Sequence, residues 1–247
     1  MVDLLLPDWP APANVRAVQT TRLGGVSGAP WAQLNLGDHV GDLPERVAAN
    51  RGALRQYLPA DPCWLTQVHG IAVVDADLPH DLPAADASVA RLPGSVCTVM
   101  TADCLPVLLC DRAGTVVAAV HAGWRGLLAG VVENALQQMR VPSGEILAWL
   151  GPAIGPACFE VGDEVRAAFV ASDAEAEHAF KAGVPGKWLA DIYALARLRL
   201  QAAGVVSISG GDLCTVSDPA RFFSYRRDGV TGRMASLIWL ESGGSGV

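Results

Sequence analysis

The chain contains 247 residues, of which 51% are hydrophobic and 17% are charged, and its formal net charge is −7. This length can bury a large core in one domain. The acidic balance argues against a nucleic-acid-binding protein, which would need a basic surface, and it gives no reason to expect binding to anionic membranes.

The amino-terminal segment MVDLLLPDWPAP has no basic start and no long apolar run, so it predicts neither a signal peptide nor a membrane anchor. We therefore expect a cytoplasmic protein whose six cysteines are free thiols. No CxxC pair is present, which argues against a zinc ribbon or a thioredoxin-like site. We assign residues 1–240 to one catalytic domain and residues 241–247 to a flexible tail.

The first half of the chain alternates strand and helix patterns. Residues 15–22 predict a strand, which a glycine-rich loop follows as far as Gly37. A helix is expected from an Asp42 cap to about Leu58, because Glu45 completes a capping-box pattern. Short apolar strands are then expected at 63–67, 71–76 and 95–102.

The second half continues this alternation. Residues 105–110 and 115–121 predict a hairpin, and residues 126–139 have the apolar spacing of a helix. Further strands are expected at 145–151, 205–209 and 233–241, and further helices at 161–171 and 189–204. Hairpins interspersed with helices favour a layered α/β or α+β fold over an all-parallel sheet. Wholly apolar strands indicate sheets that are covered on both faces.

The predicted hairpin brings a cysteine and a histidine together. If residues 112–114 form the turn, Leu105 faces His121, and Cys104 lies one residue from the directly opposed position. Opposed Cβ atoms are about 4.5–5.5 Å apart, so we expect Cys104 and His121 to be neighbours at the open end. Another histidine, His69, lies in the turn VHG between two predicted strands.

Three interpretations of these residues compete. Cysteine can pack as a small hydrophobic residue, but the glycine-bounded turn HAGWRG at His121 argues against a simple core position. Cys104 and His121 can instead form a nucleophile–base pair. With His69 as a third ligand, the set resembles a catalytic zinc site that keeps one position for water. Spacing alone leaves the nucleophile and the metal site equally open.

Other polar residues are candidates for substrate binding. The loop TRLGGVSG contains Arg22 and Ser27, and its amides and guanidinium can hold phosphate. The segment FSYRRDG places Arg226 and Arg227 before an Asp-Gly turn, which is a second candidate anion site. His39, in the loop NLGDHV, is expected to line the pocket or to support a turn.

Three carboxylates are candidates for acid–base roles, namely Asp86, Asp103 and Glu160. We expect the side chain of Asp103 to point away from that of its neighbour Cys104 if the strand extends that far. His80 lies in a proline-rich polar loop and His178 lies among charged residues, so we expect both to be solvated.

The segments TQVHG, TADCLPVLL and HAGWRG resemble the signature segments of the laccase-domain, or multicopper polyphenol oxidase, family, whose bacterial members are also called peptidoglycan editing factors. The resemblance continues through TTRLGGVS, LNLGDHVGD, GPAIGPACFEVGDEV and FFSYRRDGVTGRMASLIWL. It implies a single-domain α/β/β/α layered sandwich with mixed sheets and a zinc ion bound by His69, Cys104 and His121. It also implies phosphorolysis of purine nucleosides (adenosine, inosine, guanosine and methylthioadenosine) and adenosine deamination.

Other functions stay open beside this one. One is a hydrolase that edits peptidoglycan precursors with Cys104 as nucleophile and His121 as base. Another is a non-catalytic metal-binding or interaction module. A copper polyphenol oxidase is disfavoured, because the chain has only 5 histidines for four copper ions. Copper can nevertheless replace zinc in a His₂Cys set, since Cu²⁺ exceeds Zn²⁺ in the affinity order.

Overall fold

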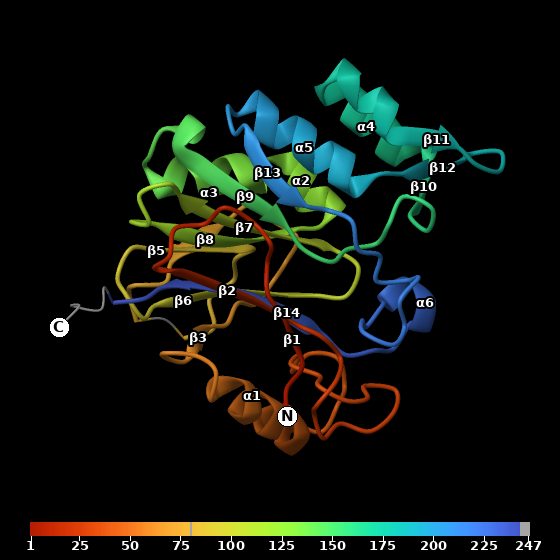
Figure 1. Ribbon diagram of the computed structural model, residues 1–247. Helices are drawn as coiled ribbons and strands as arrows, with labels where there is room; N and C mark the ends of the chain where they lie inside the picture. The colour runs from red at the N-terminus through yellow and green to blue at the C-terminus, as the bar shows by residue number, and fades with distance from the viewer. Residues whose placement is uncertain (80, 243–247) are drawn as a thin grey trace.

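Two packed β-sheets form the centre of the computed structural model, which describes residues 1–79 and 81–242 (Figure 1). The predicted tail from residue 243 onwards and His80 therefore lie outside the described residues. The larger sheet contains, in spatial order, β13 (Ser207–Gly210), β9 (Ile146–Leu150), β7 (Leu105–Asp111), β8 (Val117–Ala122), β5 (Ala87–Ala90) and β4 (Val73–Asp75). The β13–β9 and β4–β5 pairs are parallel and the others are antiparallel.

The second sheet has five strands and packs against the first (Figure 1). Its spatial order is β1 (Leu4–Leu5), β2 (Val15–Thr20), β14 (Met234–Leu240), β6 (Val96–Thr101) and β3 (Pro62–Cys63). A small third sheet at one end contains β10 (Glu160–Gly162), β12 (Lys187–Ala190) and β11 (Phe180–Ala182).

Helices cover the outer face of each large sheet. The six-stranded sheet packs on α2 (Trp124–Ala129), α3 (Val131–Met139) and α5 (Ile192–Ala202), whereas α4 (Asp163–Ser172) packs on the small third sheet. On the other side, α1 (Pro44–Arg55) packs on the five-stranded sheet. The shorter helices are η1 (Ser143–Glu145), η2 (Ala174–Ala179) and α6 (Tyr225–Asp228). This order of layers is the expected α/β/β/α sandwich with mixed sheets, and the prediction is confirmed.

The central hairpin β7–β8 divides its side chains between two cores. Leu105, Val107 and Leu109 pack toward the helices, whereas Leu108 and Cys110 pack between the two sheets. Alternate residues of a strand point to opposite faces, and here both faces are covered. This explains why the two strands are apolar throughout, and it holds the open end of the hairpin in a rigid frame.

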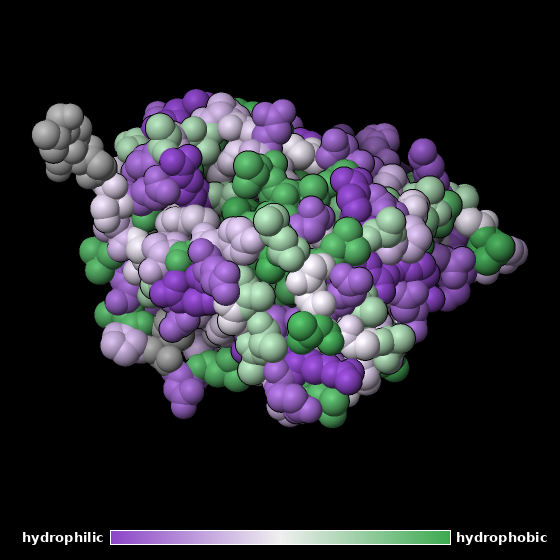
Figure 2. Space-filling view, turned by 60° about the horizontal axis from the view of Figure 1, so that its bottom comes forward, coloured by the Kyte–Doolittle hydropathy of each residue, from purple (hydrophilic) through white to green (hydrophobic). Residues whose placement is uncertain are grey.

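The molecular surface around α1 is mixed in character. In the space-filling view turned toward this side, hydrophilic side chains are interspersed with smaller hydrophobic groups (Figure 2). Only a few side chains of α1, among them Val47 and Leu54, are buried. In the part of the chain that the structure describes, every helix is too short or too polar to cross a lipid bilayer.

Two helix predictions were wrong in their details. The first helix begins at Pro44 and ends at Arg55 rather than running from an Asp42 cap to Leu58. The Asp42 carboxylate is engaged by other groups, because it accepts hydrogen bonds from Ser27 Oγ at 2.6 Å and Asn35 Nδ2 at 3.0 Å.

The predicted helix at residues 126–139 is interrupted. It forms two helices, α2 and α3, because Gly130 adopts a left-handed conformation with φ of 103° and ends α2 as its cap. Glycine enters this region at little steric cost. The break follows from a single residue in an otherwise continuous apolar pattern.

The register of the central hairpin differs from the predicted one by one residue. Leu105 pairs with Ala122, and His121 pairs with Pro106. The cause is the Asp111 carboxylate, which accepts hydrogen bonds from Thr115 N at 2.7 Å and Val116 N at 3.0 Å. These bonds stabilise a four-residue loop in place of the three-residue turn that we assumed.

Candidate metal centre and active site

Three potential ligands meet at the open end of the hairpin. The ligand atoms of His69, Cys104 and His121 all lie within 4.8 Å of one another. Cys104 immediately precedes β7, His121 lies near the end of β8, and His69 comes from the turn before β4. Within residues 1–79 and 81–242, no other group of three or more His, Cys, Asp or Glu side chains could hold a metal ion.

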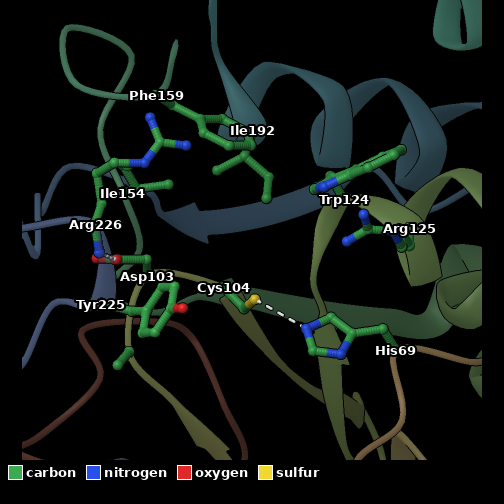
Figure 3. A pocket seen from close by; sticks show the side chains of 11 residues that line it. His69, Asp103, Cys104, Trp124, Arg125, Ile154, Phe159, Ile192, Tyr225 and Arg226 are labelled. Carbon is green, nitrogen blue, oxygen red and sulfur yellow. Dashed lines mark hydrogen bonds between the residues drawn. The ribbon is translucent and has the colours of Figure 1, made fainter. Parts of the chain in front are cut away.

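One of the ligand distances is close to that expected around a zinc ion. Zinc bonds of about 2.3 Å to sulfur and about 2.0–2.1 Å to nitrogen, at tetrahedral angles, separate ligand atoms by roughly 3.4–3.6 Å. Cys104 Sγ lies 3.7 Å from His69 Nε2 (Figure 3). The two imidazole rings of His69 and His121 meet edge to face with their centroids 4.8 Å apart. The donor set of two imidazoles and one thiolate also suits zinc or copper.

A buried carboxylate orients two of these ligands. Asp86 Oδ1 lies 2.8 Å from His121 Nδ1, and since a carboxylate only accepts, Nδ1 carries the proton and Nε2 is left for a metal. Asp86 also accepts from the amides of His69 at 2.9 Å and Gly70 at 2.6 Å. These bonds fix the turn in which His69 has a positive φ of 58°. The candidate acid–base residue Asp86 is thus a support of the cluster.

The charges of the cluster stabilise one another. Burial raises the pKa of the Cys104 thiol, but the imidazoles of His121 and His69 outweigh it, and the pKa falls to about 6. Burial lowers the pKa of His121, but the Cys104 thiolate and the Asp86 carboxylate outweigh it and raise the pKa above its ordinary value. Burial also raises the pKa of Asp86, yet the His121 imidazole and the turn amides bring it below the usual value. Cys104 is therefore held as a thiolate, which is the form that binds metals.

Close packing explains why a glycine follows β8. A Cβ atom at Gly123 would lie 2.9 Å from His69 Cδ2 and 3.0 Å from Cys104 Sγ. Any side chain at this position would therefore push the two ligands aside. The sequence shows this only as the glycine of HAGWRG, which we had interpreted as a boundary of the turn.

The cluster opens into two adjoining cavities of about 340 and 410 Å³. His69, Cys104 and Tyr225 line both of them. In the first, Trp124 and Arg125 of α2 face Tyr225 and Arg226 of α6 across the space beside Cys104 (Figure 3). The first cavity is lined by His69, Ala102, Asp103, Cys104, Trp124, Arg125, Ile154, Phe159, Ile192, Tyr225 and Arg226. Its volume is in the range of small-molecule sites.

Two predicted residues lie in these cavities. Arg226 lines the first, with its guanidinium 5.8 Å from the centre of the Phe159 ring. His39 is exposed and lines the second cavity together with Arg233. Of the two positions expected for His39, the pocket and a supporting turn, this is the pocket. Arg233 carries a guanidinium whose pKa burial lowers, against the opposing effect of Cys104 and Asp103.

Other predicted residues have polar partners within the protein. Arg22 donates to the carbonyls of Ala32 at 2.9 Å and Pro219 at 3.0 Å, and it stacks on Phe223. Ser27 is buried and donates to Asp42.

Arg227 is held in a similar way. Its guanidinium donates to the carbonyls of Thr215 at 2.8 Å and Phe222 at 3.0 Å and pairs with Asp228. The structure does not bring Arg22, Ser27 or Arg227 into the lining of either cavity.

The remaining carboxylate candidates differ from each other. Asp103 points away from the cluster and holds α6 in place, accepting from Arg226 N at 2.6 Å, Thr215 Oγ1 at 2.5 Å and Ser224 Oγ at 3.1 Å. It has a positive φ of 92°. Glu160 is exposed in β10, and His178 is exposed as expected.

Several cavity residues were missed by the sequence reasoning. Arg125 and Trp124 lie within the motif HAGWRG, and Arg125 stacks on the Trp124 ring at 4.4 Å. Tyr225 lies beside the two arginines that were noted, and Arg233 begins the segment of the last strand. The motifs could have drawn attention to these residues. The direction of the Trp124, Arg125 and Tyr225 side chains, however, depends on how α2 and α6 pack.

The fold and the cluster together define a class of protein, an α/β/β/α sandwich with a His–Cys–His group that could hold a metal ion at the open end of a central hairpin. Residues 16–241 match the family described as multi-copper polyphenol oxidoreductase laccase, and the chain belongs to this family.

Curated relatives of the chain carry a different name. A Pseudomonas aeruginosa protein named purine nucleoside phosphorylase is 60% identical over 238 residues, which are 96% of this chain and 98% of that protein. The Escherichia coli purine nucleoside phosphorylase YfiH is 56% identical and is covered in full by 97% of this chain.

Solved structures show the same fold. A crystal structure of a Neisseria meningitidis protein superposes with a TM-score of 0.94 at 55% identity, covering 97% of this chain and 99% of the other. YlmD from Geobacillus stearothermophilus superposes with a TM-score of 0.88 at 30% identity, covering 94% of each chain.

Proposed function

We propose that this protein is a zinc-dependent purine nucleoside phosphorylase. The observation that carries the proposal is the His69–Cys104–His121 group, which opens into adjoining cavities lined by aromatic and cationic side chains. The names of the relatives in Pseudomonas aeruginosa and Escherichia coli support it. The proposed substrates are adenosine, inosine, guanosine and methylthioadenosine, with adenosine deamination as a second reaction.

Aromatic side chains are suited to bind the purine. Trp124, Phe159 and Tyr225 line the first cavity, and stacking of a base on an aromatic ring contributes about 1–3 kcal/mol. Ile154 and Ile192 complete an apolar wall that excludes water from the base. These side chains come from α2, α5, α6 and the loop before β10, so the base would be held where several elements meet.

Arginines around the cluster are suited to bind phosphate. Arg226 and Arg125 line the first cavity and Arg233 lines the second. A guanidinium can donate two parallel hydrogen bonds to phosphate oxygens. We assign the main phosphate contact to Arg226. Arg22, Ser27 and Arg227, which the sequence also suggested, stay predictions, and the partners of their side chains favour a supporting role.

His69, Cys104 and His121 would hold the zinc ion, which supplies a Lewis acid beside the substrate when bound. In phosphorolysis, a phosphate oxygen forms a bond to C1′ of the ribose while the bond from C1′ to the purine nitrogen breaks. The purine keeps the electron pair and gains a proton. In deamination, water adds at C6 of adenine and ammonia leaves. Asp86 keeps the Nδ1 proton of His121 in place throughout both reactions.

Product analysis with adenosine tests the proposal. Purified, zinc-loaded protein is incubated with adenosine in buffers with and without phosphate, and the products are separated by chromatography. We expect adenine and ribose 1-phosphate only when phosphate is present, and inosine in both buffers from deamination. Equal release of adenine without phosphate would indicate hydrolysis instead. Inosine, guanosine and methylthioadenosine are then tested in the same way, and no turnover of any of the four nucleosides would contradict the proposal as a whole.

A second candidate function uses Cys104 as a nucleophile on peptidoglycan precursors. The lowered pKa of Cys104 beside His69 and His121 favours it, because a thiolate next to an imidazole is the reactive form in cysteine hydrolases. The two proposals need the same sulfur atom for different purposes. If metal-free protein is fully active on peptidoglycan precursors and inactive on nucleosides, the result supports the hydrolase and contradicts the phosphorylase.

The family description also raises copper chemistry. A four-copper oxidase needs ligands for several ions, whereas the described residues provide one three-ligand group and the whole chain has 5 histidines. We therefore propose copper only as a replacement for zinc in this group. Elemental analysis of protein produced without added copper is expected to find about one zinc per chain. A protein that contains neither metal would contradict the assignment.

A further inference from the structure

Cys158 and Cys214 form a second pair of thiols outside the metal cluster. They and Cys104 are the cysteines that are partly exposed, whereas Cys63, Cys97 and Cys110 are buried. Cys158 lies in the loop before β10, and Cys214 lies in the segment after β13. The two residues are 56 positions apart in the sequence but belong to adjacent loops.

A single hydroxyl connects the two sulfur atoms. Ser217 Oγ donates to Cys214 Sγ at 3.3 Å and lies 3.5 Å from Cys158 Sγ. If the Ser217 hydroxyl donates to Cys214, it can accept from the Cys158 thiol, so that one side chain links both sulfur atoms. The two sulfur atoms are therefore no further apart than the sum of these two distances, and the two loops must move toward each other before an S–S bond of about 2.05 Å can form.

The surroundings of Cys214 stabilise its thiolate. Gly155 N donates to Cys214 Sγ at 3.2 Å, and a Cβ atom at Gly155 would lie 2.9 Å from that sulfur, so only glycine allows this approach. Burial raises the pKa of Cys214, but hydrogen bonds from the Ser217 hydroxyl and the amides of Ser217 and Gly155 outweigh it and lower the pKa. In contrast, burial raises the pKa of Cys63 to about 12.

We propose that Cys214 and Cys158 are a redox modification site, in which a hydroperoxide oxidises Cys214 and Cys158 then forms a disulfide with it. With hydrogen peroxide, the Cys214 thiolate attacks one oxygen, the O–O bond breaks, and the other oxygen leaves as hydroxide, which takes a proton from solvent to become water, while Cys214 becomes a sulfenic acid. The Cys158 sulfur then attacks the Cys214 sulfur. The S–O bond breaks, and the oxygen leaves as a second water with the proton of the Cys158 thiol.

The disulfide would join two segments that support the first cavity. Cys158 adjoins Phe159, which lines that cavity, and its carbonyl lies 3.5 Å from Arg226 Nη1. Cys214 adjoins Thr215, whose hydroxyl donates to Asp103. The site is thus distinct from the metal ligands but is connected to the walls of the pocket.

Peptide mapping tests the proposal. The zinc-loaded, full-length protein is treated with one equivalent of hydrogen peroxide, blocked with an alkylating agent in denaturant and digested with trypsin without reduction. Cys158 is the sole cysteine of fragment 141–166 and Cys214 that of fragment 200–221. We expect these fragments to be linked, while Cys63, in fragment 56–91, stays alkylated as an internal control. Recovery of both fragments in the alkylated form would overturn the proposal.

Three variants separate the roles. With Cys158→Ser, a dione probe for sulfenic acids should label fragment 200–221, because no second thiol completes the disulfide. With Cys214→Ser, we expect no link between the fragments and no probe label on fragment 141–166. Labelling of Cys158 in that fragment would overturn the order of the steps. Ser217→Ala keeps both thiols but removes a donor to Cys214. It should slow the linkage, and an unchanged rate would contradict the role of the hydroxyl.

Discussion

The loop from Thr21 to Asp42 and the pocket beside Cys104 both contain the polar residues that sequence patterns single out, but these residues have different partners. In the loop, Ser27 donates to the Asp42 carboxylate at 2.6 Å. Arg22 donates from Nε and Nη1 to backbone carbonyls at 2.9 and 3.0 Å. These polar atoms bond within the protein, so they fix the shape of the loop.

The polar atoms of the pocket face the cavities instead. The His69 imidazole is exposed and Cys104 is partly exposed, and Arg125, Arg226 and their neighbours line the space in front of them (Figure 3). Residue type alone therefore does not identify a binding site. What matters is whether the polar atoms have partners inside the protein or are directed at an accessible space.

The largest expected effect is the loss of metal from His121→Ala. Removing a residue that merely orients a ligand typically costs about 10–100-fold in metal affinity or activity, so removing one of three ligands should cost at least as much. Nucleoside turnover should fall with it. The unfolding temperature should change less, because the apolar side chains of β7 and β8 keep their packing. Zinc content, turnover and thermal unfolding are measured on the same preparation.

His178→Ala is the matched control for this variant, because the side chain of His178 is 82% exposed and distant from the cluster in the chain. It should keep zinc and turnover. If His121→Ala keeps its zinc but loses stability, His121 is a packing residue. If it keeps its zinc and loses only activity, the nucleophile interpretation of Cys104 and His121 is correct instead.

Asp86→Asn should have the next largest effect. An amide has nearly the same size as the carboxylate, but its NH₂ group would face donors such as His121 Nδ1 and Gly70 N. We expect zinc affinity to fall by about 10–100-fold, as for other residues that orient metal ligands. Competition with a chelator measures this affinity. Unchanged affinity would show that Asp86 supports the turn but not the metal.

Arg226 in the pocket and Arg22 in the loop should respond differently to the same substitution. Hydrogen bonds to charged groups contribute about 1.5–3 kcal/mol, so Arg226→Gln should raise the KM for phosphate about tenfold or more. Its unfolding temperature should stay close to that of the unmodified protein. Arg22→Gln should do the reverse, lowering the free energy of unfolding by about 1–3 kcal/mol without changing the KM for phosphate. A raised KM in Arg22→Gln would place phosphate in the loop after all.

Sequence patterns were sufficient to predict a layered fold and to place Cys104 beside His121, and they offered His69 as a third candidate. Apolar strands, hairpin pairing and the position of Cys104 beside β7 depend on residues that are close in the chain or directly opposed. The four-layer order and the assignment of zinc came from the family resemblance. The break at Gly130 was not predictable from periodicity, because the apolar pattern continues through this residue. The helix is interrupted by the backbone of Gly130, whose φ is 103°.

The lining of the pocket could not be derived in the same way. Arg226 reaches the cavity because its amide and the Ser224 hydroxyl bond to Asp103, which lies more than 100 positions earlier in the chain. Trp124 and Arg125 reach it because α2 begins directly after Gly123. The bonds between Asp103 and the segment around α6 join parts of the chain that are distant in sequence, and no local pattern indicates them.

The smallest expected effect is at the closed end of the hairpin. Asp111 accepts three hydrogen bonds there, from Thr115 N at 2.7 Å, Thr115 Oγ1 at 2.7 Å and Val116 N at 3.0 Å. Asp111→Asn keeps the shape of the side chain but leaves at least one of these donors without its carboxylate partner. Asn Oδ1 can still accept from the two amides, and the hydroxyl of the exposed Thr115 can accept from the new NH₂ group. The change therefore replaces hydrogen bonds to a charged group by neutral ones, and we expect the free energy of unfolding, measured with urea, to fall by about 1 kcal/mol.

The metal site should not respond to the same substitution. Asp111 and the cluster lie at opposite ends of β7 and β8, and the paired residues between them, from Val107–Val120 to Cys110–Val117, are packed on both faces. Zinc affinity and nucleoside turnover of Asp111→Asn should therefore equal those of the unmodified protein at a temperature where both are folded. This makes it the matched control for Asp86→Asn, which removes a buried carboxylate at the other end. If Asp111→Asn also loses zinc, the hairpin transmits changes along its length, and the loop sets the position of His121 as well as the register.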